Sequence, residues 1–335
     1  MKLNFSQIQS ITCGAVSVQE QADGIHFHRF TGEQEMLYKD RSPDYYKKSF
    51  ATSGIALRFR TDSETLSFSA CVAAGSSRRY FAFEVLVNGV RIGILSNFDE
   101  TAMTGNYTAA ELSFGAFSKA FALGTGDKEV KILFPWSVAA VLQELTLDDG
   151  ATVTPVKAGK KILCYGDSIT QGYDALYPSS KYMTRCADLL GAEEYNKAIG
   201  GEVFWPPMAA TWEPFTPDYV WVAYGSNDWR KTTREQLIEN CAGFYDNLCR
   251  RYPDTPIYAL TPIWRKDCQK DTPLHHLAEV DAVIRAVTEK YSNVVVISAY
   301  DFVPKDEAYY ADLRLHPNEK GFAEYYRNLA EKLKP

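Results

Sequence analysis

Hydrophobic and polar positions alternate over short runs in the first 150 residues. This alternation is found in residues 55–60, 66–72, 81–87, 90–95, 129–134 and 143–147. Alternation with a period of two predicts strands that have one buried face. Asn88-Gly89, between two of these runs, predicts a tight hairpin. Many short strands with almost no helical period indicate an all-β sandwich or jelly roll.

The period of the pattern changes after residue 155. Apolar runs at 161–166, 219–224, 256–261 and 293–298 alternate with segments of helical spacing near 180–190, 233–251, 275–290 and 319–333. This alternation predicts a parallel sheet covered by helices on both faces. Pro155 and the polar and small residues around it separate the two patterns. We therefore predict two domains, 1–155 and 156–335.

The composition narrows the range of partners. A formal net charge of −6 over 335 residues gives no basic stripe for nucleic acid and disfavours an anionic membrane surface. No apolar run approaches the length of a membrane span, and the first 30 residues do not resemble a signal peptide. The seven cysteines form no Cys-x-x-Cys pair, which is typical of reduced thiols. We expect a cytoplasmic protein without nucleic-acid or membrane partners.

Four polar motifs follow predicted strands in the second half. They are Gly166-Asp167-Ser168, Gly200-Gly201, Asn227 and His316. Taken singly, each is more typical of a turn, a helix cap or a solvated loop. However, the carboxyl ends of parallel strands meet at one edge of a sheet, where ligands of open α/β sheets bind. Their common position therefore favours one shared site with Ser168 as a candidate nucleophile.

These motifs, in this order, resemble the four blocks of the GDSL esterases and lipases, also called SGNH hydrolases, over residues 160–335. The resemblance implies a flavodoxin-like three-layer α/β/α domain with Ser168 as nucleophile and His316 as its base. It also implies an oxyanion hole of the Ser168 and Gly201 N–H groups and the Asn227 amide. The preceding all-β half is similar in architecture to the jelly-roll domain of two-domain carbohydrate esterases.

One position departs from the family pattern. The family usually places Asp three residues before its histidine, but Leu313 stands there and Asp312 lies four before His316. In a helical turn, offsets of three and four share a face, so Asp312 is the predicted third member of a triad. The alternatives are a Ser-His dyad oriented by a backbone carbonyl, or an orienting carboxylate from Asp301, Asp306 or Glu307.

The expected function is that of a serine esterase acting on short acyl groups, above all acetyl, of a small-molecule or oligosaccharide ester. An acyltransferase with the same machinery and a non-catalytic carbohydrate-binding protein are the alternatives. Candidate substrate-binding residues are Asp167, Trp205, Trp229 and Trp264, although tryptophans at these positions suit core packing equally well. Adjacent His275-His276 make a poor chelate, so no metal or cofactor is predicted. The β domain either binds glycan or forms a pocket wall, and homo-oligomerisation is left open.

Overall fold

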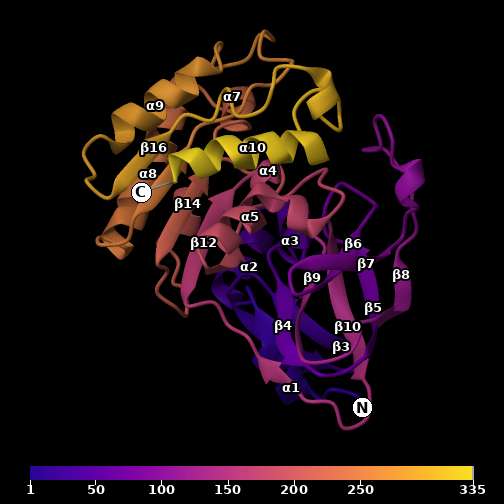
Figure 1. Cartoon of the computed structure of the whole chain (residues 1–335). Coiled ribbons are helices and arrows are strands. Elements are labelled where there is room, and N and C mark those ends of the chain that lie inside the picture. Colours follow the sequence, from indigo (N-terminus) through magenta and orange to yellow (C-terminus); the bar gives the residue numbers. More distant parts are fainter. Residues whose placement is uncertain (334–335) are drawn as a thin grey trace.

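The computed structural model describes residues 1–333, and its first half is an antiparallel β-sandwich (Figure 1). One sheet has the order β1 (Thr12–Cys13), β4 (Ala56–Thr61), β9 (Lys128–Leu133), β6 (Ala82–Val87), β7 (Val90–Ser96), with β11 (Thr154–Pro155) beside β4. The other has the order β2 (Ser17–Gln21), β3 (Gly24–His28), β10 (Val138–Leu147), β5 (Thr65–Ala74), β8 (Gly115–Ala122). Side chains such as Phe59, Phe68 and Phe83 fill the space between the sheets. The predicted sandwich is confirmed.

Three helices interrupt the β pattern of this half: α1 (Phe5–Ile11), α2 (Gly32–Arg41) and α3 (Pro43–Ser49). They were not predicted, because their apolar residues are few. In α2 only Gln34 and Tyr38 are buried, and the helix begins with a capping box on Thr31. Helices α2 and α3 lie between the sandwich and the second half of the chain (Figure 1). Their side chains therefore reach the second domain.

The second half contains a parallel sheet with the order β13 (Ala192–Asn196), β12 (Lys160–Gly166), β14 (Tyr219–Ala223), β15 (Ile257–Leu260), β16 (Val294–Ile297). This is the 2-1-3-4-5 order of flavodoxin-like sheets. Helices α5 (Tyr182–Leu189) and α10 (Glu319–Lys332) pack on one face. Helices α6 (Pro206–Ala210), α8 (Arg234–Arg251) and α9 (Ala278–Thr288) pack on the other. The predicted three-layer α/β/α domain is confirmed.

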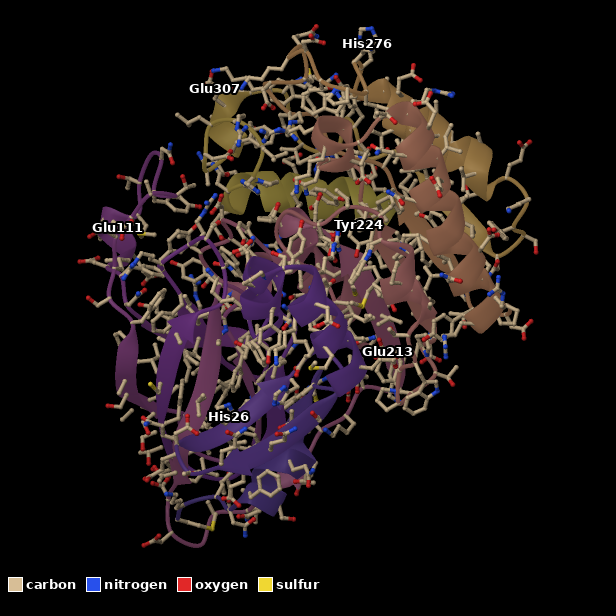
Figure 2. The ribbon with its side chains drawn as sticks, turned by 180° about the vertical axis from the view of Figure 1, so that it is seen from behind. His26, Glu111, Glu213, Tyr224, His276 and Glu307 are labelled. Atoms are coloured by element: carbon tan, nitrogen blue, oxygen red, sulfur yellow. The ribbon has the colours of Figure 1, made fainter. Side chains whose placement is uncertain are left out.

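The two halves are joined by buried polar contacts. The guanidinium of Arg29, which is 1% exposed, donates to the carbonyl oxygens of Asn196 (2.7 Å) and Ala198 (3.0 Å). Gln34 of α2 donates to Glu213 at 2.6 Å, and Figure 2 shows Glu213 close to the N-terminal half. These contacts converge on the segment that follows β13, so the N-terminal half touches a loop that the sequence places in the candidate site.

Among residues 1–333, no helix is both long and apolar enough to cross a membrane.

Candidate active site

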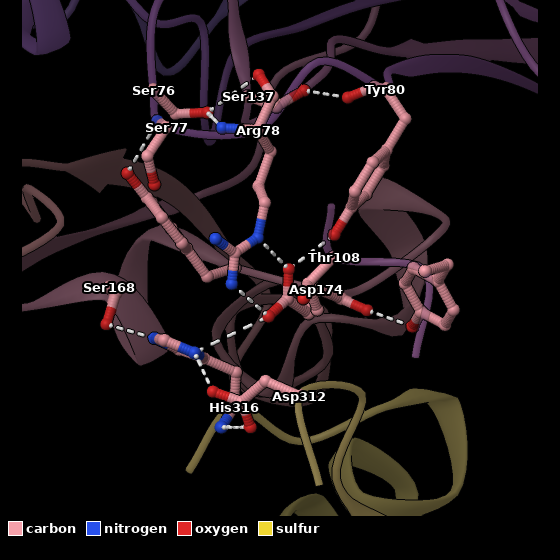
Figure 3. A network of polar contacts seen from close by, with 12 residues as sticks. Ser76, Ser77, Arg78, Tyr80, Thr108, Ser137, Ser168, Asp174, Asp312 and His316 are labelled. Carbon is pink, nitrogen blue, oxygen red and sulfur yellow. Dashed lines mark hydrogen bonds and ion pairs between the residues drawn. The ribbon is translucent and has the colours of Figure 1, made fainter. Parts of the chain in front are cut away.

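Ser168 stands at the carboxyl end of the central strand β12. That strand ends at Gly166, and α4 (Ser168–Gln171) begins immediately, with Asp167 accepting a hydrogen bond from the Ile169 N–H at 3.0 Å. A Cβ on Gly166 would lie 2.5 Å from the Thr170 hydroxyl oxygen, so only glycine fits this tight exit. The Ser168 hydroxyl lies 2.8 Å from Nε2 of His316 (Figure 3). The turn therefore presents Ser168 directly to a histidine.

His316 is held by a compact turn before α10. Oδ1 of Asp312 accepts the backbone N–H groups of Arg314 (3.0 Å), Leu315 (2.7 Å) and His316 (3.0 Å). Leu313 adopts a φ of 56°, which closes the turn. Oδ2 of Asp312 then lies 2.8 Å from Nδ1 of His316. The structure thus brings Ser168, His316 and Asp312 into one line of contacts, with the carboxylate at the unusual offset of four.

The ionisation of Asp312 suits this position. Burial acts to raise the pKa of its carboxyl. The hydrogen bond and charge of His316, together with the backbone N–H groups of Leu315 and His316, outweigh burial and hold the pKa well below its ordinary value. Asp312 therefore carries a negative charge at neutral pH. An anion at Nδ1 fixes the tautomer in which Nε2 can accept the serine proton.

A second carboxylate, Asp174, faces the same nitrogen. Its Oδ2 lies 3.4 Å from Nδ1 of His316, and its side chain is fully buried. Arg78 holds it through two hydrogen bonds, from Nε at 2.6 Å and Nη2 at 2.7 Å, and the Tyr80 hydroxyl donates to it as well (Figure 3). Ser168, His316 and Asp174 therefore also have a triad-like geometry.

Sequence reasoning missed Asp174. Its partners Arg78 and Tyr80 come from the β-sandwich, 96 and 94 positions away in the chain. The only local signal is an aspartate six residues after the nucleophile, and it does not belong to any of the four motifs. Its backbone φ of 71°, rare for a residue with a side chain, is visible only in the structure.

These acids and the histidine also have a spacing that suits a cation. One atom each of Asp174, Asp312 and His316 lies within 4.8 Å of the others. Arg78 already supplies a cation to Asp174, and both carboxylates point to Nδ1 of one imidazole. This arrangement favours stabilisation of an imidazolium over ligation of a metal.

The predicted oxyanion donors are largely free of other acceptors. Within residues 1–333, the N–H groups of Ser168 and Gly201 have no hydrogen-bond acceptor. Asn227 donates from Nδ2 to the Glu202 carbonyl at 3.0 Å and lies 3.5 Å from the Asp167 carboxylate. The second contact is at the outer limit for a hydrogen bond, so one amide hydrogen stays available to another acceptor.

Asp167 is buried beside the nucleophile. It is 3% exposed, caps α4 and lies next to Asn227. Burial raises the pKa of its carboxyl to about 6. The observed contacts of Asp167 are those of a helix cap, and its predicted contact with substrate stays a prediction.

The structure places Trp229 differently from the predicted substrate-binding position. It is fully buried, and its Nε1 donates to the His275 carbonyl at 3.2 Å. The Arg265 guanidinium lies over the indole, 4.7 Å from the centre of the Trp229 ring. A side chain enclosed in this way cannot stack on a sugar, so its predicted role in substrate binding is wrong. The alternative of core packing applies.

Trp205 and Trp264 are half-buried. The Arg41 guanidinium lies 4.1 Å from the Trp205 ring, and the Trp264 ring packs 5.6 Å from that of Tyr310. Trp205 thus joins the N-terminal helices to the segment after Gly201. Their exposed edges leave both as candidates for contact with substrate.

The comparisons with known proteins agree with this geometry. The GDSL-like Lipase/Acylhydrolase family matches residues 164–323. No curated protein matches the chain.

Several solved structures share the fold of both halves. The salicylyl-acyltransferase SsfX3 from a tetracycline biosynthetic pathway is 20% identical with a TM-score of 0.77, and 96% of this chain and 93% of that chain are covered. An acetyl xylan esterase from Butyrivibrio proteoclasticus is 14% identical with a TM-score of 0.62, covering 99% and 98%. A family two carbohydrate esterase from Clostridium thermocellum, solved with cellohexaose, is 15% identical with a TM-score of 0.61, covering 85% and 93%. At these identities the likeness shows the fold alone.

Proposed function

Because residues 164–323 match the GDSL-like Lipase/Acylhydrolase family, we propose that the chain is a serine esterase for short acyl esters of a carbohydrate. The observation that carries this proposal is the unbroken line of contacts from the Ser168 hydroxyl through His316 to Asp312, with 2.8 Å at each step. A hydroxyl, an imidazole and a carboxylate in this order form the machinery of acyl transfer through a covalent intermediate.

In the first half of the reaction, Ser168 attacks the ester carbonyl while Nε2 of His316 takes its proton. The ester C=O π bond opens and leaves a negative charge on the oxygen. The N–H groups of Ser168 and Gly201 and the amide of Asn227 donate to that oxygen. The imidazolium, stabilised by Asp312, then protonates the leaving alcohol as the ester C–O bond breaks. A water repeats these steps on the acyl-enzyme and restores Ser168.

The proposal of a short acyl group is supported by enclosure. Ser168 is 6% exposed and His316 is 9% exposed, and Tyr173 packs on the imidazole with ring centroids 5.5 Å apart. A long acyl chain would have to displace these neighbours. The proposal of a sugar alcohol is supported by the fold shared with an acetyl xylan esterase and with a carbohydrate esterase that binds cellohexaose.

The test is a panel of p-nitrophenyl esters and acetylated sugars on wild type and on Ser168→Ala. We expect wild type to prefer acetyl over longer esters and Ser168→Ala to lose turnover. Asn227→Ala should keep its fold and lower kcat by roughly a hundredfold to a thousandfold, the usual cost of one oxyanion donor. If Ser168→Ala hydrolyses the panel as fast as wild type, the esterase proposal fails.

An acyltransferase is the second candidate. It is favoured by the shared fold with SsfX3, whose TM-score of 0.77 exceeds those of the two carbohydrate esterases above. The same acyl-enzyme would then be attacked by an alcohol. Product analysis with and without a sugar acceptor separates the two: a transferase gives mainly acylated acceptor, whereas an esterase gives mainly free acid.

A further inference from the structure

The dipeptide Gly200-Gly201 is hydrogen-bonded on almost every side. The N–H of Gly200 donates to Oε1 of Gln171 at 2.8 Å. The carbonyl of Gly200 accepts a hydrogen bond from Nζ of Lys48 at 2.9 Å. The N–H of Gly201 has no acceptor in the described part of the chain, residues 1–333. Of the two polar groups of the Gly200–Gly201 peptide bond, the N–H, which is the predicted oxyanion donor, is therefore the free one.

Lys48 comes from the N-terminal half. It lies in the last turn of α3, is 9% exposed, and is 152 positions from Gly200. Its ammonium also contacts Asp44, one turn earlier, at 2.5 Å. The carboxylate keeps the cation in place, and the helix end directs it to the Gly200 carbonyl. Two elements of different domains thus meet at one peptide bond.

The geometry of a peptide unit connects this contact to catalysis. The Gly200 carbonyl and the Gly201 N–H belong to the same planar trans unit, so they point in nearly opposite directions. This unit lies between two glycines, and Gly201 has a φ of 92°. With no side chain on either side, rotation of the plane meets little steric resistance. A hydrogen bond that holds the carbonyl therefore also sets the direction of the N–H.

A cation on the carbonyl has a second effect. Hydrogen bonds from an ammonium are about twice as strong as neutral ones, and a polarised amide donates more strongly through its N–H. Lys48 therefore both aims and strengthens the donor. Tyr45 (2.9 Å) and Lys231 (2.6 Å) donate to the next carbonyl, that of Gly201, which belongs to a different peptide plane.

We propose that Lys48 is a positioning residue of the oxyanion hole, supplied by the N-terminal domain to fix and polarise the Gly200–Gly201 peptide. The inference rests on the proposed esterase function. It predicts that loss of the ammonium weakens binding of the tetrahedral transition state and leaves binding of the ester nearly unchanged.

The experiment compares Lys48→Met, which keeps the length of the side chain, with Lys47→Met. Lys47 is the neighbour on the same helix, and its side chain is 48% exposed. We expect Lys48→Met to lower kcat by about tenfold to a hundredfold, less than loss of a whole donor, with KM changed by less than about twofold. Lys47→Met should behave as wild type.

A boronic acid, which forms a tetrahedral anionic adduct with the active-site serine, supplies the second readout. Its inhibition constant should rise in Lys48→Met by about the same factor as kcat falls, because both report the charged tetrahedral state. A role confined to domain cohesion would lower the melting temperature without this parallel change. Lys48→Gln, whose neutral amide can still donate, should give an intermediate kcat, and it covers the case in which Lys48→Met does not fold.

The proposal is overturned if the folded variants keep the kcat and boronic acid affinity of wild type. Failure of the esterase proposal looks different, because Ser168→Ala would then equal wild type in the same assays. Loss of turnover in Ser168→Ala together with full turnover in Lys48→Met would leave the esterase intact and remove Lys48 from the oxyanion hole.

Discussion

Substitution of Asp312 by Asn tests which carboxylate orients His316. Oδ1 accepts three backbone N–H groups of the turn, and Oδ2 faces Nδ1 at 2.8 Å. An asparagine can keep the first set of contacts with its single oxygen. Its NH₂ group then replaces Oδ2 and faces Nδ1 as a donor. The imidazole is driven toward the tautomer that cannot accept the Ser168 proton, while the turn is preserved.

The expected magnitude depends on Asp174. At an effective dielectric constant of about 20, a unit charge 2.8 Å from Nδ1 attracts an imidazolium by ~6 kcal/mol and one at 3.4 Å by ~5 kcal/mol. Distance alone therefore hardly separates the two acids. The charge of Arg78, bonded to Asp174 by two hydrogen bonds, offsets much of the second attraction. We expect Asp312→Asn to lower kcat by about a thousandfold, somewhat less than the roughly ten-thousandfold cost of losing a sole triad acid.

The assay is hydrolysis of p-nitrophenyl acetate across a pH series. Asp312 stays ionised down to strongly acidic pH, so Asp312→Asn removes a negative charge at every pH of the series, and kcat should fall throughout it. Asp301→Asn is the matched control, because Asp301 is 79% exposed and bonded to Lys305. If kcat of folded Asp312→Asn falls by less than about tenfold, the reasoning is refuted, and the imidazole of His316 is oriented by Asp174 or by a backbone carbonyl.

Three further outcomes are expected for buried positions around the candidate site. Arg78→Met leaves the fully buried Asp174 without its cation, so urea unfolding should show a free energy lower by about 3–5 kcal/mol. Gly200→Ala places a Cβ 2.4 Å from the Tyr173 hydroxyl, which should displace the ring that packs on the imidazole and lower kcat in steady-state assays. Burial raises the pKa of Asp228 from 3.8 to about 7, so the folded state binds the extra proton and wild type loses stability as pH rises through that window. The melting temperature of Asp228→Asn should therefore rise relative to that of wild type as the pH increases from 3.8 to about 7. A difference in melting temperature that does not change with pH would contradict the raised pKa of Asp228.

The layers of both domains were predictable, because they depend on periodicity. Alternation in 55–60 and 66–72 predicted strands that became β4 and β5, and the apolar run 161–166 became β12. Helices α2 and α3 escaped prediction because their apolar faces are short and their buried contacts are polar. Periodicity detects apolar faces, and it does not detect helices that are docked by hydrogen bonds.

The candidate site divides in the same way. Ser168, Gly201, Asn227 and His316 follow strands of one sheet, so local sequence and topology were sufficient to expect them together. The residues around this site could not be placed in the same way, because their orientation depends on packing. Trp229 lies in a similar sequence context to Asn227 but turns into the core, where Arg265 covers it. Whether a residue beside a strand end faces the cleft or the core depends on packing that has no local signal.

The contacts of the N-terminal domain bear on its two predicted roles, glycan binding and a pocket wall. A glycan-binding module or a simple spacer would need only to touch the second domain. Instead, Arg78 neutralises one acid beside His316, and Lys48 holds the peptide of the oxyanion donor. These residues come from different segments of the domain, and in the proposed mechanism they support the proton transfer and the charge on oxygen. Because buried ionic contacts are costly unless they are completed, a hydrolase domain with Asp174 unpaired would be destabilised at its own active site. We therefore propose that the sandwich is part of the structure that supports the candidate active site.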